Sequence, residues 1–283
     1  MAVRIVTDSS CDLTHDEVAA HGVEVVPLSI RFGDEEFEDG TELTVEAFYD
    51  KLGSSSVLPE TSAPAPGKFE AAFRRQAEAG ADAIVCINLS AGLSATMQSA
   101  RNAATAFEGG VPVHVIDSRS ITSGLGTQVL LAAQAGADGA SGDEVVALVN
   151  DLVARTHVFG ALDTLDNLKK GGRIGGAQAL VGSLLSIKPI LDISSGEVEE
   201  AGKVRTRRKA LDALRDKVVE AGAVEHLRVT HGFAPDVDAM VDLLAEHYDR
   251  AGIKVGHIGP VIGAHGGPRV MGVTWVDPGP VRH

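Results

Sequence analysis

Cysteine, cationic side chains and long apolar runs are all scarce in this chain of 283 residues. Its two cysteines lie far apart, and no CxxC or Cys/His spacing of the kind that binds metal occurs, so we expect no metal site. Lys and Arg number 25 against 39 Asp and Glu, which gives a net charge of −14. A protein so poor in cations is not expected to bind nucleic acid or to be attracted strongly to anionic lipid headgroups.

The lack of long apolar runs bears on location. No window holds 18 uninterrupted apolar residues, so we expect no stable membrane insertion. The opening "MAVRIVTDSS" lacks the apolar stretch of a secretory signal, and we expect a reduced, cytoplasmic setting. Cys86, inside an apolar strand pattern, is expected to be a buried, inert thiol. Cys11 follows a polar turn and is open to a structural or a reactive interpretation.

The first half of the chain alternates strand and helix patterns. We expect strands at 3–10, 23–30, 83–89 and 111–117, and helices at 14–20, 44–53, from Pro66, at 95–107 and at 123–136. The segment 54–67 is rich in Ser and Pro, and we expect it to be loop. Strands that alternate with helices of this length predict an α/β domain with a doubly wound, mainly parallel sheet.

The second half mixes a hairpin with helices and is expected to be α+β. We expect strands at 158–162, 187–194, 197–206, 226–232, 254–262 and 269–276, and helices from Gly142, at 177–186, at 207–221 and at 236–250. A boundary around residues 140–157 then divides the chain into an N-terminal domain, 1–150, and a C-terminal domain, 151–283. No long heptad pattern is present, so we expect a monomer.

Hydroxyl side chains gather where a predicted strand gives way to a helix. Ser90 and Ser94 follow an apolar strand pattern, and Thr61 and Ser62 precede another helix. Ligands of open α/β sheets collect at the carboxyl ends of the strands, and helix N-termini favour anions. The pattern therefore predicts a site for a carboxylate or phosphate group, although capping of the next helix explains Ser94 equally well. No GxGxxG or GxxxxGK[ST] motif supports nucleotide binding.

Glycine-rich segments hold two further candidates. His265, in "IGAHGGPR", is expected in a turn after a strand, where its imidazole could donate to an acid group. Arg173, in "KKGGRIGG", fits either a helix C-terminal turn or a guanidinium held over a site. The basic run "KVRTRRK" (203–209) is either a solvated helix start or a docking surface for an acidic partner.

An enzyme alternative is a serine hydrolase. "GLSAT" (92–96) is similar to the nucleophile elbow G-x-S-x-G, with Ser94 as the nucleophile. Candidates for the acid and the base follow in the hydrolase order: Asp163 or Asp192, then His231 or His265. Against this hypothesis, Thr96 replaces the second glycine and would crowd the turn, and no HGGG-like oxyanion sequence is present.

Six motifs occur in the order found in the DegV family of bacterial fatty-acid-binding, FakB-type proteins. They are "IVTDSSCDL" (5–13), "TSAPAPGKF" (61–69), "LSAGLSATMQSA" (89–100), "LDTLDNLKKGGRI" (162–174), "GKVRTRRKAL" (202–211) and "GPVIGAHGGP" (259–268). The resemblance covers essentially the whole chain. It implies an α/β N-terminal domain and an α+β C-terminal domain, with one long-chain fatty acid, expected to be C16–C18, buried between them.

The resemblance also implies roles for the candidate residues. Thr61 and Ser94 would hold the carboxylate close to His265, with Ser62 and Ser90 beside them. Arg173 and Arg205 would serve the acyl-phosphate step or the docking of a partner. That partner is an ATP-dependent fatty acid kinase, with an acyltransferase of phospholipid synthesis possible downstream. The chain itself would be a carrier with no catalytic residue and no cofactor. A lipid-sensing module that signals through the basic run is a third hypothesis.

The chain departs from the family pattern at five positions. Ala65 and Ala91 replace serines, Ala95 and Arg269 replace glycines, and Met97 replaces a tyrosine. The loss of a hydroxyl at residue 91 leaves fewer donors at the expected site. These departures bear on the preferred acyl chain and on the kinase partnership.

Overall fold

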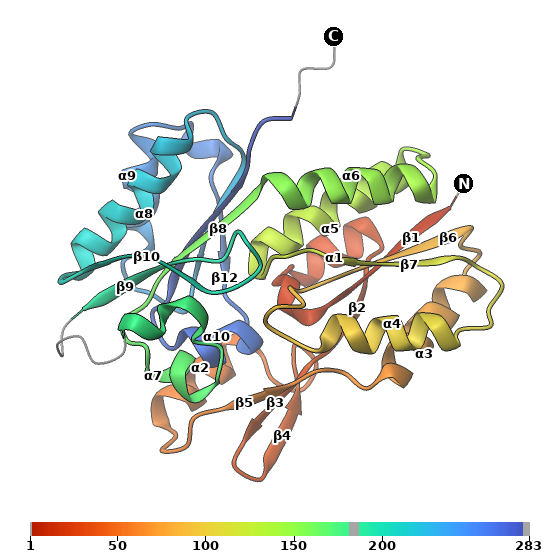
Figure 1. The fold of residues 1–283 in the computed structure, drawn as a ribbon, viewed down its shortest axis with the longest axis horizontal. Coiled ribbons are helices and arrows are strands. Elements are labelled where there is room, and N and C mark those ends of the chain that lie inside the picture. Colours follow the sequence, from red (N-terminus) through yellow and green to blue (C-terminus); the bar gives the residue numbers. More distant parts are fainter. Residues whose placement is uncertain (1, 181–186, 280–283) are drawn as a thin grey trace.

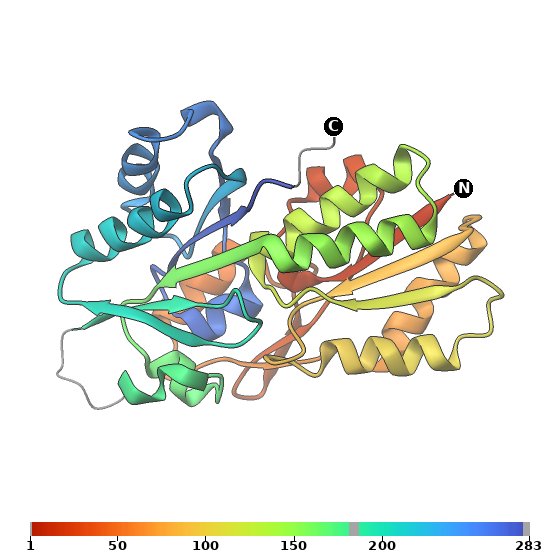
Figure 2. The same cartoon turned by 45° about the horizontal axis from the view of Figure 1, so that its top comes forward.

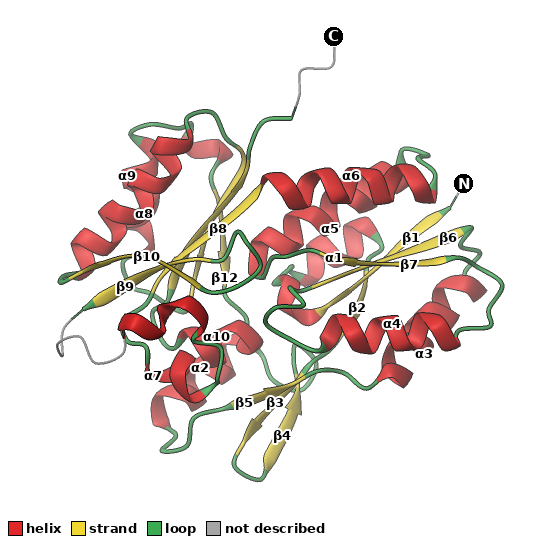
Figure 3. Ribbon diagram, viewed as in Figure 1, coloured by secondary structure: helices red, strands yellow, loops and turns green. Residues whose placement is uncertain are grey.

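In the computed structural model, which describes residues 2–180 and 187–279, the chain forms three sheets (Figures 1 and 3). One is a four-stranded parallel sheet with the order β2 (Glu24–Val26), β1 (Val3–Asp8), β6 (Ala83–Asn88), β7 (Val113–Asp117). Its strands are short apolar runs, and β6 is buried along its whole length. A parallel strand buried on both faces reads as a continuous apolar run, which is why the sequence predicts this sheet well.

Helices cover both faces of the parallel sheet (Figure 2). They are α5 (Thr122–Ala137) and α6 (Gly142–Arg155) on one face, and α3 (Pro66–Glu78) and α4 (Thr96–Ala106) on the other. Alternate residues of β6 face opposite layers: Val85 and Ile87 pack with α5, whereas Ile84 and Cys86 pack with α3 and α4. The predicted doubly wound α/β domain is confirmed. A capping box formed by Thr14 and Glu17 begins α1 (His15–His21), as predicted.

The second sheet is mixed and has six strands. Their order is β10 (Glu199–Val204), β9 (Lys188–Asp192), β8 (Thr156–Ala161), β13 (Met271–Val276), β11 (Glu225–His231), β12 (Lys254–His257). Helices α8 (Arg207–Ala221) and α9 (Val237–Ala245) cover one face, where Leu214 and Met240 pack on Val273. The other face turns toward the first domain, and its Val158 and Leu191 share one core with α5. The two sheets therefore enclose a common interior.

A small antiparallel sheet, β4–β3–β5, projects from the first domain, and it corrects two predictions. The expected strand 23–30 is wrong, because it divides at Pro27 into β2 and β3 (Ser29–Phe32), which belong to different sheets. Proline has no N–H to continue a ladder. The expectation that 54–67 is only loop is also wrong. It contains β5 (Glu60–Ser62), which is held by pairing with β3 rather than by its own composition. The two edge strands are β5 and β4 (Glu35–Glu38).

Two short helices complete the wall next to this sheet. The expected strand 254–262 is wrong beyond β12, because Pro260 begins a helix, α10 (Pro260–Gly266). Proline suits the first helical position, since its fixed φ is helical and its missing N–H has no helical partner there. His265 therefore lies in the last turn of a helix and not in a turn after a strand. The helix α2 (Val45–Ser54) packs on α10 through Phe48 and Tyr49.

The remaining elements are short. They are α7 (Asp166–Lys170) and the 3₁₀ turns η1 (Ser9–Cys11), η2 (Gly175–Leu180) and η3 (Arg250–Gly252). The predicted helix 177–186 begins in η2, and its residues 181–186 lie outside the described part of the chain. Because α6 packs on the parallel sheet and β8 begins at the next residue, we propose Arg155–Thr156 as the domain boundary. No helix among residues 2–180 and 187–279 is long and apolar enough to cross a membrane.

Candidate lipid-binding site

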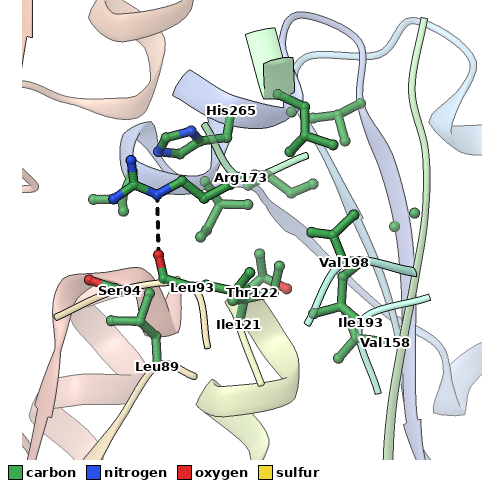
Figure 4. Close-up of a pocket in the computed structure, with 18 of the residues that line it drawn as sticks. Leu89, Leu93, Ser94, Ile121, Thr122, Val158, Arg173, Ile193, Val198 and His265 are labelled. Carbon is green, nitrogen blue, oxygen red and sulfur yellow. Dashed lines mark hydrogen bonds between the residues drawn. The ribbon is translucent and has the colours of Figure 1, made fainter. Parts of the chain in front are cut away.

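A cavity lies between the two domains, where the parallel strands end and the uncovered face of the six-stranded sheet begins (Figure 4). Leu89 and Ile121 supply its wall from the first domain, at the loop after β6 and the start of α5. Val158, Ile193 and Val198 supply the wall from the second domain. These branched side chains make most of the interior apolar, so the cavity suits a hydrocarbon.

The cavity is large enough for a chain-like ligand. The space between its walls is about 1050 Å³, part of which opens to solvent. The volume open to water inside the cavity is about 160 Å³. This is on the order of ten times the space that one water molecule needs.

One end of the cavity carries polar side chains from three distant parts of the chain. Thr61 Oγ1, on β5, lies 2.9 Å from His265 Nε2, on α10. Ser62 and Ser94 line the cavity as well. Ser94 Oγ accepts the N–H of Thr96 at 3.2 Å and lies 2.9 Å from Thr96 Oγ1. Ser94 thus accepts the N–H of the first residue of α4, although the N-cap position itself is Ala95, and it also faces the cavity. Its role toward a carboxylate stays a prediction.

The imidazole of His265 is neutral at ordinary pH. Burial, assisted by the positive charge of Arg173, lowers its pKa to about 4. Its Nδ1 is buried and has no hydrogen-bond partner among the described residues. A β-carbon added at Gly171 would stand 2.2 Å from this Nδ1, so the glycine after α7 leaves the space that the ring occupies. The "KKGG" motif therefore positions His265 from the opposite wall.

Arg173 spans the two domains at the same end. Its Nε donates to the carbonyl oxygen of Leu93 at 3.2 Å, and Nη1 donates to that of Gly171 at 2.7 Å. Its side chain is exposed to solvent and lines the cavity, and Figure 4 shows the guanidinium beside His265. A cation at the mouth of an apolar cavity favours an anionic head group.

Two of the predicted residues lie outside the cavity lining. The hydroxyl of Ser90 donates to the carbonyl oxygen of Gly196 in the β9–β10 turn, which ties the two domains together. Ser90 Oγ also accepts the N–H of Gly92 at 3.2 Å. Arg205 is exposed at the end of β10, away from the cavity residues. We therefore leave Ser90 out of the proposed head-group site and assign Arg205 to the surface.

The basic run divides between interior and surface. Arg207 Nε donates to Asp236 Oδ2 at 2.8 Å, and its Nη1 lies 3.7 Å from Asp163 Oδ1. Arg208 pairs with Asp212 along α8 at 3.3 Å. Of the cations at 203–209, Arg207 is thus neutralised inside the domain and Arg208 is paired at the surface, which weakens the hypothesis of a purely basic docking surface.

The residues of the hydrolase hypothesis do not form a triad. Ser94 contacts Thr96, and the Nε2 of His265 contacts Thr61. Asp163 instead pairs with Lys188 at 2.9 Å. The other candidates lie elsewhere: Asp192 accepts the N–H of Ser194, and His231 accepts the N–H of Ala234. No described contact supplies Ser94 with a base, and acid–base chemistry at a serine requires one.

Several sequence departures have local explanations. Ala95 lines the cavity, and Met97 is buried in α4 at 3% exposure. Arg269, where the family carries glycine, has a left-handed φ of 60°, a conformation that glycine adopts at no cost. Cys11 and Cys86 are buried, and burial raises the pKa of both thiols, which favours the inert interpretation of each. Among the described residues, no group of three or more His, Cys, Asp and Glu could hold a metal ion.

The contact between Gly171 and His265 gives a sharp prediction. Gly171→Ala keeps an ordinary backbone conformation, with φ near −70°, but its methyl group displaces the imidazole. If His265 supports the head-group site through Thr61, ligand affinity falls about tenfold, which is the effect of one hydrogen bond. A lipid-displacement titration measures this change. Gly53→Ala is the control, since nothing lies within 4 Å of its added carbon. Equal affinities for the two variants would refute this role for Gly171.

Sequence comparison agrees with this geometry. Residues 2–277 match the family described as "Uncharacterised protein, DegV family". A DegV domain-containing protein of Streptomyces coelicolor is 40% identical over 276 residues, which cover 96% of this chain and 97% of that protein.

Two solved structures extend the likeness. A fatty-acid-binding DegV family protein of Thermus thermophilus has a TM-score of 0.89 and 34% identity, with coverage of 98% of this chain and 100% of that one. A stearic-acid-binding protein of Eubacterium ventriosum has a TM-score of 0.85 and 25% identity, with coverage of 97% and 98%. The match over nearly the whole chain establishes that this protein belongs to the DegV family.

Proposed function

We propose that this protein is a FakB-type carrier that binds one long-chain fatty acid and presents its carboxylate to a separate ATP-dependent kinase. The observation that carries the proposal is the contact of Thr61 with His265 at one end of a mostly apolar cavity. Fatty acid binding by relatives of the same fold supports it. The acyl phosphate formed by the kinase would then pass to an acyltransferase.

The polar end suits a carboxylate in the following arrangement. We assign the neutral His265 the tautomer with its proton on Nε2, which then donates to Thr61 Oγ1. In this tautomer the hydroxyl proton of Thr61 is left for a ligand oxygen. We likewise assign Thr96 Oγ1 as the donor to Ser94 Oγ, because Thr96 is buried and Ser94 faces the cavity. The hydroxyl proton of Ser94 is then also directed to the ligand. Two hydroxyl donors and the positive charge of Arg173 hold the carboxylate in its ionised form.

The apolar walls account for retention of the tail. Burial of about 14 methylene groups of a C16 acid contributes roughly 11 kcal/mol at about 0.8 kcal/mol each. Association costs about 4–15 kcal/mol in lost freedom, so the tail supplies most of the affinity and the head group supplies the orientation. Stearic acid in the Eubacterium ventriosum relative agrees with a C16–C18 preference.

The carboxylate remains reachable in this arrangement, as a kinase requires. Arg173 is exposed beside His265 at the mouth, where it can stabilise charge that develops on a phosphoryl group. The chain contributes no nucleophile to this step, because the ligand oxygen itself attacks the phosphoryl donor. We propose that Arg205, exposed at the end of β10, contributes to kinase docking.

Native mass spectrometry of the purified protein tests the proposal. We expect one adduct of about 250–290 Da, which is the mass of an acid with the C16–C18 tail argued above. Extraction and identification of that acid would also report the preferred chain. Protein that carries no lipid and takes up no added fatty acid would refute the carrier. Fluorophosphonate labelling of Ser94 in the same sample would favour the hydrolase instead.

A further inference from the structure

A second hollow lies between the domains, on the far side of the cavity wall. The first domain contributes η1, α1, the loop 39–44 and the start of α2 to this cleft. The second domain contributes β11, β12 and the start of α10. The volume open to water in this cleft is about 860 Å³, against about 160 Å³ in the lipid cavity. Polar side chains line much of the cleft, and Leu13, Val45 and Val255 are among its apolar lining residues. The head-group residues described above do not face this cleft.

The partition between cavity and cleft is one residue thick. Among the described residues, Thr230 on β11 is the one that lines both spaces. Beside it the chain alternates between them: Thr122 lines the cavity and Ser123 the cleft, while Ile258 lines the cavity and Gly259 the cleft. Thr230 is 2% exposed. The side chain of Thr230 is therefore part of the wall of both spaces.

The floor beneath the partition is a row of glycines. In the six-stranded sheet, Gly160 of β8 pairs with Gly272 of β13, Gly272 with Thr230, and Thr230 with Gly256 of β12. Directly paired residues point to the same face of a sheet, so Thr230 is the one side chain in this row of four. Gly160 and Gly272 line the cavity, and Gly256 lines the cleft. The row is a shallow trough from one space to the other, interrupted by Thr230.

The trough has room above it. A β-carbon at Gly160 would come within 3.8 Å of one backbone oxygen, and one at Gly256 within 3.9 Å of Thr230 Cγ2, which are ordinary contacts. At Gly272 the added carbon would lie 2.9 Å from Thr230 Oγ1. The hydroxyl of Thr230 thus leans toward the cavity and its methyl group toward the cleft.

The hydroxyl of Thr230 has no structural task in the described parts of the chain. Its Oγ1 is buried without a hydrogen-bond partner, an arrangement that destabilises the fold. What the side chain does supply is volume, at the one point where the glycine trough is closed.

We propose that Thr230 sets the longest acyl chain that the protein accepts, by closing the trough between the lipid cavity and the second cleft. This inference rests on the proposed function, since it concerns the tail of the same ligand. With a smaller side chain at residue 230, the end of a longer tail would pass over Gly256 into the cleft, where Leu13, Val45 and Val255 would receive it.

A chain-length series tests the inference. Affinities of saturated acids from C14 to C22 are measured by lipid displacement for the wild type and for Thr230→Ala. For the wild type we expect a rise of about fourfold per methylene while the cavity fills, followed by a fall. For Thr230→Ala the maximum should move to a longer chain, with a gain of about tenfold for the first acid beyond the wild-type limit. Thr230→Val keeps the shape of the wall and should keep the wild-type maximum.

Gly256 supplies the decisive second variant, because it lines the cleft and not the cavity. Gly256→Val alone should leave the affinity for a C16 acid unchanged. Combined with Thr230→Ala, it should cancel the gain for longer acids by filling the far side of the trough. Thr230→Ser, which removes the cleft-side methyl group alone, should give a smaller extension and replaces Thr230→Ala if that variant does not fold.

The outcomes separate the inference from the proposed function. Wild-type protein that binds no acid in the series refutes the proposed function. Wild-type protein that binds C16 acid, with the same maximum in the wild type and in the alanine or serine variant, refutes the role of Thr230 while the carrier function stands. A longer maximum that Gly256→Val does not reverse would also overturn it, because the tail would then not follow the trough.

Discussion

Replacing Thr61 by valine and Ser94 by alanine together is expected to lower the affinity for a C16–C18 acid at least a hundredfold. Each hydroxyl is proposed to donate to the carboxylate, and a hydrogen bond to a charged group contributes about 1.5–3 kcal/mol. The loss of two such bonds exceeds about 3 kcal/mol, which corresponds to more than a hundredfold in affinity. The valine keeps the shape of Thr61, and neither change touches the apolar walls. Titration calorimetry near pH 7.5 measures the effect.

Matched hydroxyls elsewhere provide the control for this variant. Ser54→Ala and Thr105→Val remove exposed hydroxyls that bond to backbone oxygens of their own helices, outside the cavity. This control pair should bind the acid as the wild type does. A double variant at Thr61 and Ser94 that stays within threefold of the wild type would show that the carboxylate is held elsewhere. The unfolding temperatures of both pairs should be compared, so that a loss of fold is not read as a loss of site.

Asp39→Asn is expected to stabilise the protein above pH 7 by roughly 4 kcal/mol. Asp39 is 6% exposed, and burial raises the pKa of its carboxyl from 3.8 to about 7. Between these values the unfolded chain has released a proton that the folded chain still holds. Stability is therefore lost as pH rises from about 4 to about 7, and the penalty stays constant above that range. One pH unit of difference corresponds to about 1.4 kcal/mol.

Urea unfolding at pH 4.5 and at pH 8 distinguishes this effect from a general change. The amide oxygen of asparagine can still accept the hydroxyl of Ser9, so the local contact survives. The variant should gain much more at pH 8 than at pH 4.5. Asp34→Asn, at an exposed turn, removes the same charge without burial and should change stability little. A variant that is less stable than the wild type at both pH values would contradict the prediction.

Most of the fold could be predicted from the sequence, because local patterns and tertiary demands agree there. The buried strands β1 and β6 are rich in Val and Ile, and Thr14 with Glu17 marks a helix start unambiguously. The wrong predictions concern segments whose secondary structure is determined by contacts with other parts of the chain. The strand β5 is polar and exists because β3 pairs with it. The helix α10 could have been predicted, because Pro260 after a glycine is a pattern typical of a helix start. Its apolar residues, however, also fit a strand.

The sequence indicated which residues to consider for the candidate site, but not how they are arranged in space. Thr61 and His265 stand 204 positions apart, and the motifs of a known family indicated both, not their spacing. The structure also contributed wall residues that no motif marks. Thr122 lines the cavity with a left-handed φ of 50°, which β-branched residues rarely adopt. The partition at Thr230 depends on the register of four strands, and a register of that kind is fixed by the packed fold rather than by any local pattern.

The strand order of the six-stranded sheet has a consequence for synthesis of the chain. The strand β13 comes last in the sequence among the six strands of this sheet, yet it lies between β8 and β11 near the middle of the sheet. During synthesis, the edges of β8 and β11 that will pair with β13 stay unpaired until Val276 has left the ribosome. Unpaired edges are sites of misassembly, so this interval is the vulnerable stage of biogenesis. The wall that carries Gly160, Gly272 and Thr230 is complete only when β13 inserts, and the cavity between the domains therefore forms last.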